Sequence, residues 1–248
     1  MRQFIKTSVL SELLTIVGFP RLRRLYLKAR RAGLETLLDY QRLALLSAAV
    51  DYTRGLEGDV IECGTYRGGS AAIIGQMLRG TDKFLHLCDS FKGLPEPGCH
   101  DNYHLGGDFH ETSAALVERG LRLLDVPSKL HVGFFETTLP ALAHLRFALA
   151  HIDVDLYSSV KISLEFCYPR MSTGGIIIFD DYGAPTCLGA KRAVDEFFAA
   201  RPEKPTPLSR PAYAVCVGRD RPSVFEMLRP RAGWLSALPV LGAAVYRR

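Results

Sequence analysis

The sequence predicts a doubly wound α/β fold: a mostly parallel sheet with helices on both faces, preceded by a helical N-terminal extension. Two observations predict it. Between residues 59 and 217, short apolar runs typical of buried strands alternate with stretches that favour helices, which is the order of elements in a parallel α/β sheet. The first run, 59–63, also continues through a glycine-containing turn into a helix start at Ser70, as the first β-α unit of such folds does.

The N-terminal residues 1–56 are expected to be helical, because apolar side chains such as Leu13 and Val17 recur at helical spacing. Gly18-Phe19-Pro20 should end the first helix, and Gly33 should separate the second helix from the third. An extension of this kind serves either as a lid over a ligand site or as a cover for one face of the sheet. The sequence leaves both roles open.

The composition suits one α/β domain with added terminal segments, since the chain has 248 residues of which 48% are hydrophobic. We expect the main domain at 57–220 and a tail at 221–248 that packs on this domain or on a second subunit, which would make a homo-oligomer. The net charge of +5 is concentrated near the two termini without a basic and aromatic motif for nucleic acid. Scattered cysteines, no signal peptide and no apolar run of about 20 residues predict a cytoplasmic protein without a transmembrane segment.

Three glycines lie between the first predicted strand and the following helix: Gly64, Gly68 and Gly69. Glycine lets the backbone approach a ligand closely, and a helix N-terminus offers free N–H groups. The spacing E-x-G-x-x-x-G from Glu62 onward differs from the G-x-G-x-x-G of dinucleotide enzymes. A carboxylate at Glu62 favours a cationic ligand, and S-adenosylmethionine carries a sulfonium and an ammonium group. A tight turn without a ligand is the alternative.

The second predicted strand, 83–88, ends at Asp89. A carboxylate at this place is suited to accept hydrogen bonds from ribose hydroxyls, although it could also cap the turn that follows. The next segment, 95–107, is rich in proline, glycine, histidine and aspartate, and we expect it to cross the carboxyl edge of the sheet and contact a substrate. The spacings of its histidines, together with His110, fit no standard zinc pattern, which disfavours a metal site in this loop.

Four aspartates directly follow two further buried runs, 147–152 and 176–179: Asp153, Asp155, Asp180 and Asp181. Because neighbouring parallel strands end at the same edge of a sheet, these carboxylates should gather and repel one another. A divalent cation would remove the repulsion, and an all-oxygen ligand set favours Mg²⁺ or Mn²⁺ over Zn²⁺. As an alternative, individual aspartates could only cap the following helix or turn.

The remaining elements complete the alternation. We expect helices at 110–124, 158–170 and 191–199, a strand at 129–132, and a hairpin-like pair made by 205–211 and 212–217 at the edge of the sheet. In that hairpin the last strand would run antiparallel to the others. Phe134 or Phe135, which follow the third strand, could lie against an adenine ring or belong to the core.

Four strings in this order resemble the macrocin O-methyltransferase family: VIECGTYRGGSA, CDSFKGLP, HIDVDLYSS and GGIIIFDDYGAP. The resemblance covers roughly residues 55–200 and implies a Rossmann-like methyltransferase fold with a seven-stranded sheet. It implies S-adenosylmethionine as methyl donor, and Mg²⁺ held by Asp153, Asp180 and Asp181. The positions that we expect to bind the donor are the following: Glu62, Gly64, Thr65, Tyr66, Gly68, Ser70, Asp89, Ser90 and Phe91.

The expected reaction is methylation of a hydroxyl group on a sugar or another natural-product small molecule. Asp153 is the candidate to take the hydroxyl proton while it holds the metal, and Asp155 is the alternative; His151 is assigned no role because it should be buried in its strand. Two other classes of function remain. A nicotinamide-dependent oxidoreductase is disfavoured by the missing G-x-G-x-x-G and the four aspartates, and a non-catalytic S-adenosylmethionine-binding module would share the donor site alone.

Overall fold

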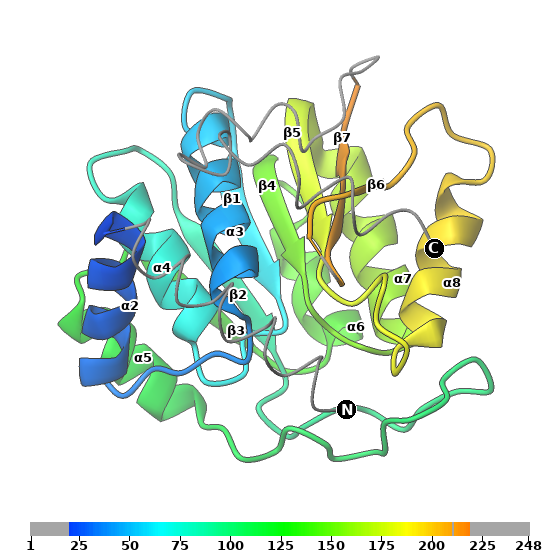
Figure 1. The fold of residues 1–248 in the computed structure, drawn as a ribbon, viewed down its shortest axis with the longest axis horizontal. Coiled ribbons are helices and arrows are strands. Elements are labelled where there is room, and N and C mark those ends of the chain that lie inside the picture. The colour runs from blue at the N-terminus through cyan, green and yellow to red at the C-terminus, as the bar shows by residue number, and fades with distance from the viewer. Residues whose placement is uncertain (1–19, 210, 219–248) are drawn as a thin grey trace, which may run out of the picture.

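Seven strands form one sheet in the part of the chain that the computed structural model describes, residues 20–209 and 211–218. The strands are β1 (Asp59–Cys63), β2 (Leu85–Asp89), β3 (Ser128–Val132), β4 (Phe147–Ile152), β5 (Met171–Phe179), β6 (Thr206–Pro207) and β7 (Tyr213–Cys216). Their order in the sheet is β3-β2-β1-β4-β5-β7-β6 (Figure 1). The first five are parallel, whereas β7 runs antiparallel to both β5 and β6. The predicted fold class and the antiparallel hairpin at the edge are therefore confirmed.

The helices are α2 (Pro20–Arg31), α3 (Tyr40–Thr53), α4 (Gly69–Leu78), α5 (Ala114–Leu123), α6 (Phe135–Thr138), α7 (Tyr157–Cys167) and α8 (Leu188–Phe198), with 3-10 turns at Leu139–Leu142 and Tyr168–Arg170. The first expected helix and the tail 221–248 lie outside the described residues. Among the described residues, no helix combines the length and the apolar character that a membrane crossing requires.

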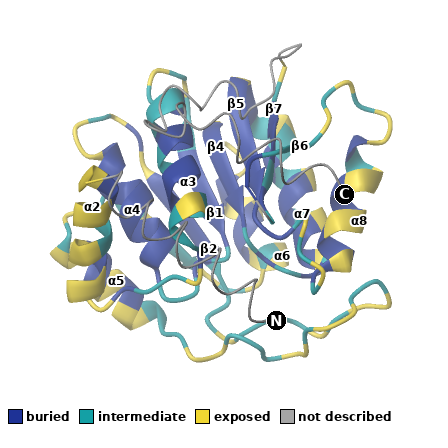
Figure 2. Cartoon of the chain, in the orientation of Figure 1, coloured by how far each residue is buried: buried dark blue, intermediate teal, exposed yellow. Residues whose placement is uncertain are grey.

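Two hydrophobic layers cover the two faces of the sheet. One joins α2, α3 and α4 to the sheet through residues such as Leu22, Leu43 and Ile73, and the other joins α7 and α8 through residues such as Leu164 and Val194. The central strands are buried and the outward sides of the helices are exposed (Figure 2). The N-terminal helices α2 and α3 thus share one core with α4 and β1, and α3 covers a face of the sheet.

Side chains in a strand alternate between these two layers, because a strand has a period of two residues. In β1, Val60 belongs to the layer under α3 and α4, whereas Ile61 and Cys63 belong to the layer under α7 and α8. Glu62 therefore points to the face that α3 covers. In β4, Leu149 lies in the same layer as Val60, which places His151, two residues further, on that face too.

Several boundaries differ from the sequence-based expectation. The segment between α2 and α3 is extended and not helical, because Asp39 begins α3 as its N-cap and accepts a hydrogen bond from the backbone N–H of Arg42 at 2.8 Å. Helix α5 begins at Ala114 and not at residue 110, and β5 begins at Met171, before the glycines that were expected to precede it. The short helix α6 has no counterpart among the predicted elements.

Candidate active site

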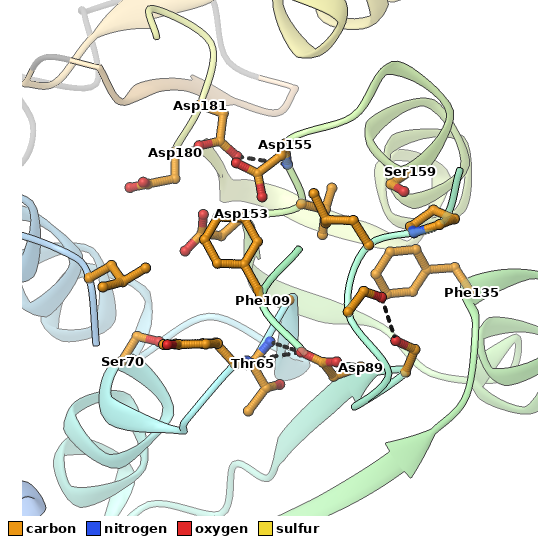
Figure 3. A pocket seen from close by; sticks show the side chains of 18 of the residues that line it. Thr65, Ser70, Asp89, Phe109, Phe135, Asp153, Asp155, Ser159, Asp180 and Asp181 are labelled. Atoms are coloured by element: carbon orange, nitrogen blue, oxygen red, sulfur yellow. Dashed lines mark hydrogen bonds between the residues drawn. The ribbon is translucent and has the colours of Figure 1, made fainter. Parts of the chain in front are cut away.

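A cavity of about 230 Å³ opens at the carboxyl ends of β1, β2, β4 and β5 (Figure 3). The strand order reverses between β1 and β4, which is where doubly wound sheets bind their ligands. Most of the predicted site residues line this cavity: Gly64, Thr65, Tyr66, Ser70, Asp89, Ser90, Asp153, Asp155, Asp180 and Asp181. Three do not line it: Glu62, Gly68 and Phe91. Gly68 instead forms the N-cap of α4 with a left-handed backbone.

The turn after β1 depends on Gly64. Its φ angle is +86°, and a Cβ atom at this position would lie 1.8 Å from the carbonyl oxygen of Asp153. No other residue could therefore let β1 and β4 end so close together. The turn leads directly into α4, with Ser70 in the first turn of that helix and in the cavity wall.

Asp89 fastens this turn to the end of β2. Its Oδ2 atom accepts hydrogen bonds from the backbone N–H groups of Thr65 at 2.7 Å and Tyr66 at 2.9 Å (Figure 3). Its Oδ1 atom accepts one from the N–H of Phe91 at 2.7 Å. Asp89 therefore caps the turn that follows β2, which is one of the two roles that the sequence left open. Its carboxylate also lies in the cavity wall. The first two strand ends form a preorganised surface without any ligand.

Glu62 is fully buried, faces the layer under α3 and does not line the cavity, and its role in donor binding stays a prediction. Its Oε1 atom lies 2.9 Å from Nδ1 of His151, which is also buried. Burial alone would lower the pKa of His151, but the carboxylates of Asp180 and Glu62 outweigh it and raise this pKa well above the usual value. Strands β1 and β4 thus carry a buried pair of a carboxylate and a histidine. The sequence around Glu62 or around His151 did not predict that these two residues are partners.

Three aspartates converge at the ends of β4 and β5, as predicted. One carboxylate oxygen from each of Asp153, Asp180 and Asp181 lies within 4.8 Å of the others. Burial, together with the charge of Asp180, raises the pKa of Asp153 well above its usual value. Burial, together with the charges of Asp155 and Asp153, does the same to the pKa of Asp181. A buried group of mutually repelling carboxylates is short of positive charge.

Arg42 supplies part of that charge, and the sequence did not reveal it. Its guanidinium Nη1 pairs with Oδ2 of Asp180, and Nη2 donates to the carbonyl of Leu37 at 3.0 Å. Arg42 lines the cavity together with Thr36, Leu37 and Leu38 from the segment before α3. The N-terminal extension therefore contributes a wall of the cavity in addition to covering the sheet.

The loop 95–110 crosses the carboxyl edge, as expected. Asp101 accepts a hydrogen bond from the first N–H of α7, at Tyr157, at 2.8 Å. Asn102 accepts one from the first N–H of α8, at Leu188, at 3.1 Å and donates to the carbonyl of Pro185 at 3.1 Å. Because these side chains cap two helices, the loop is fastened to the body of the protein, and Phe109 completes the cavity wall.

The two phenylalanines after β3 both line the cavity. Phe134 is 42% exposed, whereas Phe135 also packs against the hydrophobic layer under α7. Of the two roles that the sequence left open, Phe135 has the core position, and the contact with an adenine ring stays a prediction. Phe134 is the freer of the two to contact a ligand.

The fold is that of the S-adenosylmethionine-dependent O-methyltransferases. The sequence matches the model of the macrocin-O-methyltransferase (TylF) family over residues 28–210, and the chain belongs to that family. It is similar to the O-methyltransferase NovP in structure, with a TM-score of 0.67, 30% identity, and coverage of 74% of this chain and 82% of that chain.

Two curated relatives come from streptomycetes. The 8-demethyl-8-(2,3-dimethoxy-alpha-L-rhamnosyl)-tetracenomycin-C 4'-O-methyltransferase of Streptomyces olivaceus is 34% identical over 172 residues, which are 62% of this chain and 65% of the relative. The demethyldecarbamoylnovobiocin O-methyltransferase of Streptomyces niveus is 33% identical over 186 residues, which are 68% of this chain and 69% of the relative. The match thus spans about two thirds of the length of each relative.

Proposed function

We propose that this chain transfers the methyl group of S-adenosylmethionine to a hydroxyl group of a sugar attached to a natural product, assisted by Mg²⁺ or Mn²⁺. One observation carries the proposal: a preorganised glycine turn and a cluster of buried aspartates face each other across a single cavity. The sugar is supported by the rhamnosyl group in the name of the Streptomyces olivaceus relative. Family membership argues against a nicotinamide-dependent oxidoreductase and against a module that only binds the donor.

The donor would lie against the ends of β1 and β2. The turn from Gly64 to Tyr66 offers close backbone approach, and Asp89 lies in the wall at the place where a ribose hydroxyl can donate to it. Phe134 offers an aromatic surface at the end of β3. The sulfonium would face the acidic ends of β4 and β5, which suits its positive charge.

The residues that would hold the cation are Asp153, Asp180 and Asp181. Their ligand atoms are all oxygens and lie within 4.8 Å of one another, which fits Mg²⁺ or Mn²⁺ and disfavours softer metals. Burial and mutual repulsion raise the pKa of Asp153 and of Asp181, as expected for carboxylates that are short of positive charge. When bound, such a cation supplies Lewis acidity that lowers the pKa of an acceptor hydroxyl.

The chain's own groups supply positioning and a proton acceptor. In the transfer, the carbon–sulfur bond of the donor breaks, a carbon–oxygen bond forms opposite it, and the sulfur keeps the electron pair. The hydroxyl proton goes to a carboxylate, for which Asp153 is the candidate and Asp155 the alternative. In the absence of a cation, burial raises the pKa of both carboxyl groups. The loop 95–110 and the segment before α3 wall the cavity and hold the acceptor in line.

The test is methyl transfer to a panel of natural products, each offered with and without its sugar, in the presence of isotope-labelled S-adenosylmethionine and Mg²⁺. We expect mass spectrometry to find one labelled methyl group on the sugar of at least one glycosylated compound and none on the matching aglycones. Labelling of the aglycones would contradict the sugar assignment. Calorimetry that finds binding of NAD(H) and not of S-adenosylmethionine would contradict the donor. The cytoplasmic location, the absence of a nucleic-acid partner and the homo-oligomer stay predictions.

A further inference from the structure

Beside the aspartate cluster, three donor atoms of different chemistry meet. They are Nε2 of His104 in the loop 95–110, Oδ1 of Asp155 after β4, and Sγ of Cys187 just before α8. The nitrogen lies 3.4 Å from the oxygen and 3.6 Å from the sulfur, and the sulfur lies 3.5 Å from the oxygen. Three segments that are far apart in the sequence thus bring an imidazole, a carboxylate and a thiol to one point.

These three separations match the edges of a tetrahedral zinc site. Zinc binds thiolate sulfur at about 2.3 Å and histidine nitrogen or carboxylate oxygen at about 2.0–2.2 Å. At tetrahedral angles, these bond lengths place nitrogen and oxygen about 3.4 Å apart, and sulfur about 3.6 Å from either of them. The spacing is that of three ligands around one ion.

The other side of the His104 ring supports the same assignment. Nδ1 lies 3.4 Å from Oδ2 of Asp108, and that carboxylate is held by the backbone N–H of Leu105 at 3.0 Å. A metal-binding histidine commonly donates its second N–H to a carboxylate in this way, which fixes the ring and its tautomer. With the proton on Nδ1, Nε2 presents a lone pair to the Asp155 carboxylate.

The surroundings keep the three donors out of bulk water. The side chains of His104 and Asp155 are 10% and 16% exposed, and Cys187 is 3% exposed. The rings of Tyr103 and Phe109 flank the imidazole, with centroids 5.2 Å and 5.5 Å away. A desolvated set of this kind holds a bound ion more strongly than exposed side chains do.

We propose that His104, Asp155 and Cys187 form a second metal site, for a thiol-binding divalent cation of the Zn²⁺ class, separate from the all-oxygen site of the other three aspartates. Nitrogen and sulfur ligands favour such a cation over Mg²⁺. Three protein ligands leave the fourth position to water or to an oxygen of a bound molecule.

An ion at this site would hold the loop 95–110 against the carboxyl end of β4 and the N-terminus of α8. It would in this way fix the acceptor side of the cavity. It would also occupy Oδ1 of Asp155, which leaves Asp153 to take the proton in methyl transfer. The backbone N–H of Asp155 donates to Oδ2 of Asp181 at 3.0 Å, so the two metal sites are joined through one residue.

The experiment titrates Co²⁺, as a spectroscopic substitute for Zn²⁺, into the full chain in the presence of excess Mg²⁺. We expect one equivalent of Co²⁺ to produce a thiolate-to-cobalt charge-transfer band and the intense visible bands of a tetrahedral ion, and one equivalent of Zn²⁺ to remove both. Cys187→Ser should lose the charge-transfer band. Asp108→Asn should weaken Zn²⁺ affinity by roughly 10–100-fold, the usual effect of removing such a supporting carboxylate.

Two controls separate this site from others. Cys99→Ser should keep the full spectrum, although the exposed Cys99 thiol lies 3.7 Å from Nδ1 of His100. Asp181→Asn should keep it as well, because Asp181 belongs to the all-oxygen site; the result therefore does not depend on methyl transfer. A wild-type protein without the charge-transfer band, or a band that persists in folded Cys187→Ser, would overturn the proposal.

Discussion

The two halves of the cavity are built on opposite principles. At the ends of β1 and β2, the one carboxylate in the cavity wall, Asp89, accepts three backbone hydrogen bonds. At the ends of β4 and β5, four carboxylates lie close together. Asp180 pairs with Arg42, Asp155 lies 3.4 Å from His104, and Asp181 accepts the backbone N–H of Asp155. Burial raises the pKa of Asp153, Asp155 and Asp181. The first half of the cavity, the donor half, satisfies its polar groups without a ligand, whereas we expect the second, the acidic half, to require a cation.

This difference predicts which parts of the reaction can be separated. A half that satisfies its own polar groups keeps its shape when the other is disturbed, because its hydrogen bonds are local. A cluster of repelling charges gains stability from whatever neutralises it. Donor binding should therefore tolerate changes in the acidic half, while catalysis and metal-linked stability should not.

The largest expected effect comes from Asp181→Asn. An amide oxygen is a weaker ligand than a carboxylate, and a cation contributes several kcal/mol to the transition state. At about 1.4 kcal/mol per factor of ten, we expect turnover to fall by about a thousandfold or more. The affinity for S-adenosylmethionine, measured by calorimetry, should stay within about threefold of wild type. Asp125→Asn, at a side chain that is 87% exposed, is the matched control.

Thermal stability should show the same contrast. Asp153 and Asp181 have folded pKa values above their unfolded values, so they stabilise the protein at acid pH and this stability is lost as the pH rises through the folded pKa. At neutral pH, Mg²⁺ at about 100 times its Kd should restore about 2.7 kcal/mol. That corresponds to a rise of roughly 5–10 °C in Tm for a chain of this size.

Calorimetric scans of the metal-free and Mg²⁺-loaded protein measure this effect. Metal-free Asp181→Asn should melt no lower than metal-free wild type, since one repelling charge is gone, and should gain little from Mg²⁺. Asp125→Asn should respond to Mg²⁺ as wild type does. An unchanged Tm of wild type in saturating Mg²⁺ would count against a cation at the aspartates.

A substitution of Asp89 in the donor half should have a smaller effect, on the affinity for the donor. Asp89→Asn removes the charge that would hold the ribose hydroxyls. It keeps one oxygen for the turn, so at least one of the three backbone hydrogen bonds to Asp89 is also lost. Loss of a charge-assisted hydrogen bond of about 1.5–3 kcal/mol should weaken donor binding roughly tenfold or more. We expect the maximal rate at saturating donor to stay near wild type. Donor affinity equal to wild type in calorimetry would remove Asp89 from the donor site.

Parallel-sheet topology explains why so much of the site could be predicted from the sequence. Asp89, Asp153 and Asp180 each follow a recognisable buried strand, and parallel strands end at one edge, so local patterns were sufficient to bring them together. The same reasoning does not give the direction of Glu62, because strand residues alternate between the two faces of the sheet. Glu62 shares the face of Val60, two residues earlier, and this face lies under α3.

Contacts between distant segments could not be predicted in that way. Arg42 reaches Asp180 only because an extended segment, and not a continued helix, leads into α3. His104 meets Cys187 only because the loop 95–110 folds back over α8. Neither histidine spacing nor cysteine spacing encodes such a meeting, since the ligands come from separate strand ends and loops. In both cases tertiary packing decides the partner.

The smallest predicted effect concerns two histidines, His86 and His131, which do not line the cavity. Their contribution to stability changes with pH in the direction opposite to that of Asp153 and Asp181. Burial and the charges of His86 and Lys129 lower the pKa of His131 to about 4, and burial lowers that of His86. Both histidines resist protonation in the folded state, so stability falls as the pH drops from about 6.5 toward about 4. The acidic cluster gains stability over the same change.

His131→Gln should reduce this acid-induced loss by on the order of 1 kcal/mol or less, because the partly exposed ring is screened by solvent. Denaturant unfolding at about pH 7 and about pH 5 measures the difference. An equal loss of stability in the variant and in wild type would show that the histidine pair does not contribute.

The central claim is that the donor half works alone and the acidic half requires a cation. Its most direct test measures S-adenosylmethionine affinity and methyl transfer side by side on protein stripped with EDTA, using an acceptor identified in the panel. We predict near-normal donor affinity, no turnover, and recovery of turnover on addition of Mg²⁺. Full turnover by the metal-free protein would contradict the account, and the aspartates would then act only as turn caps or bases.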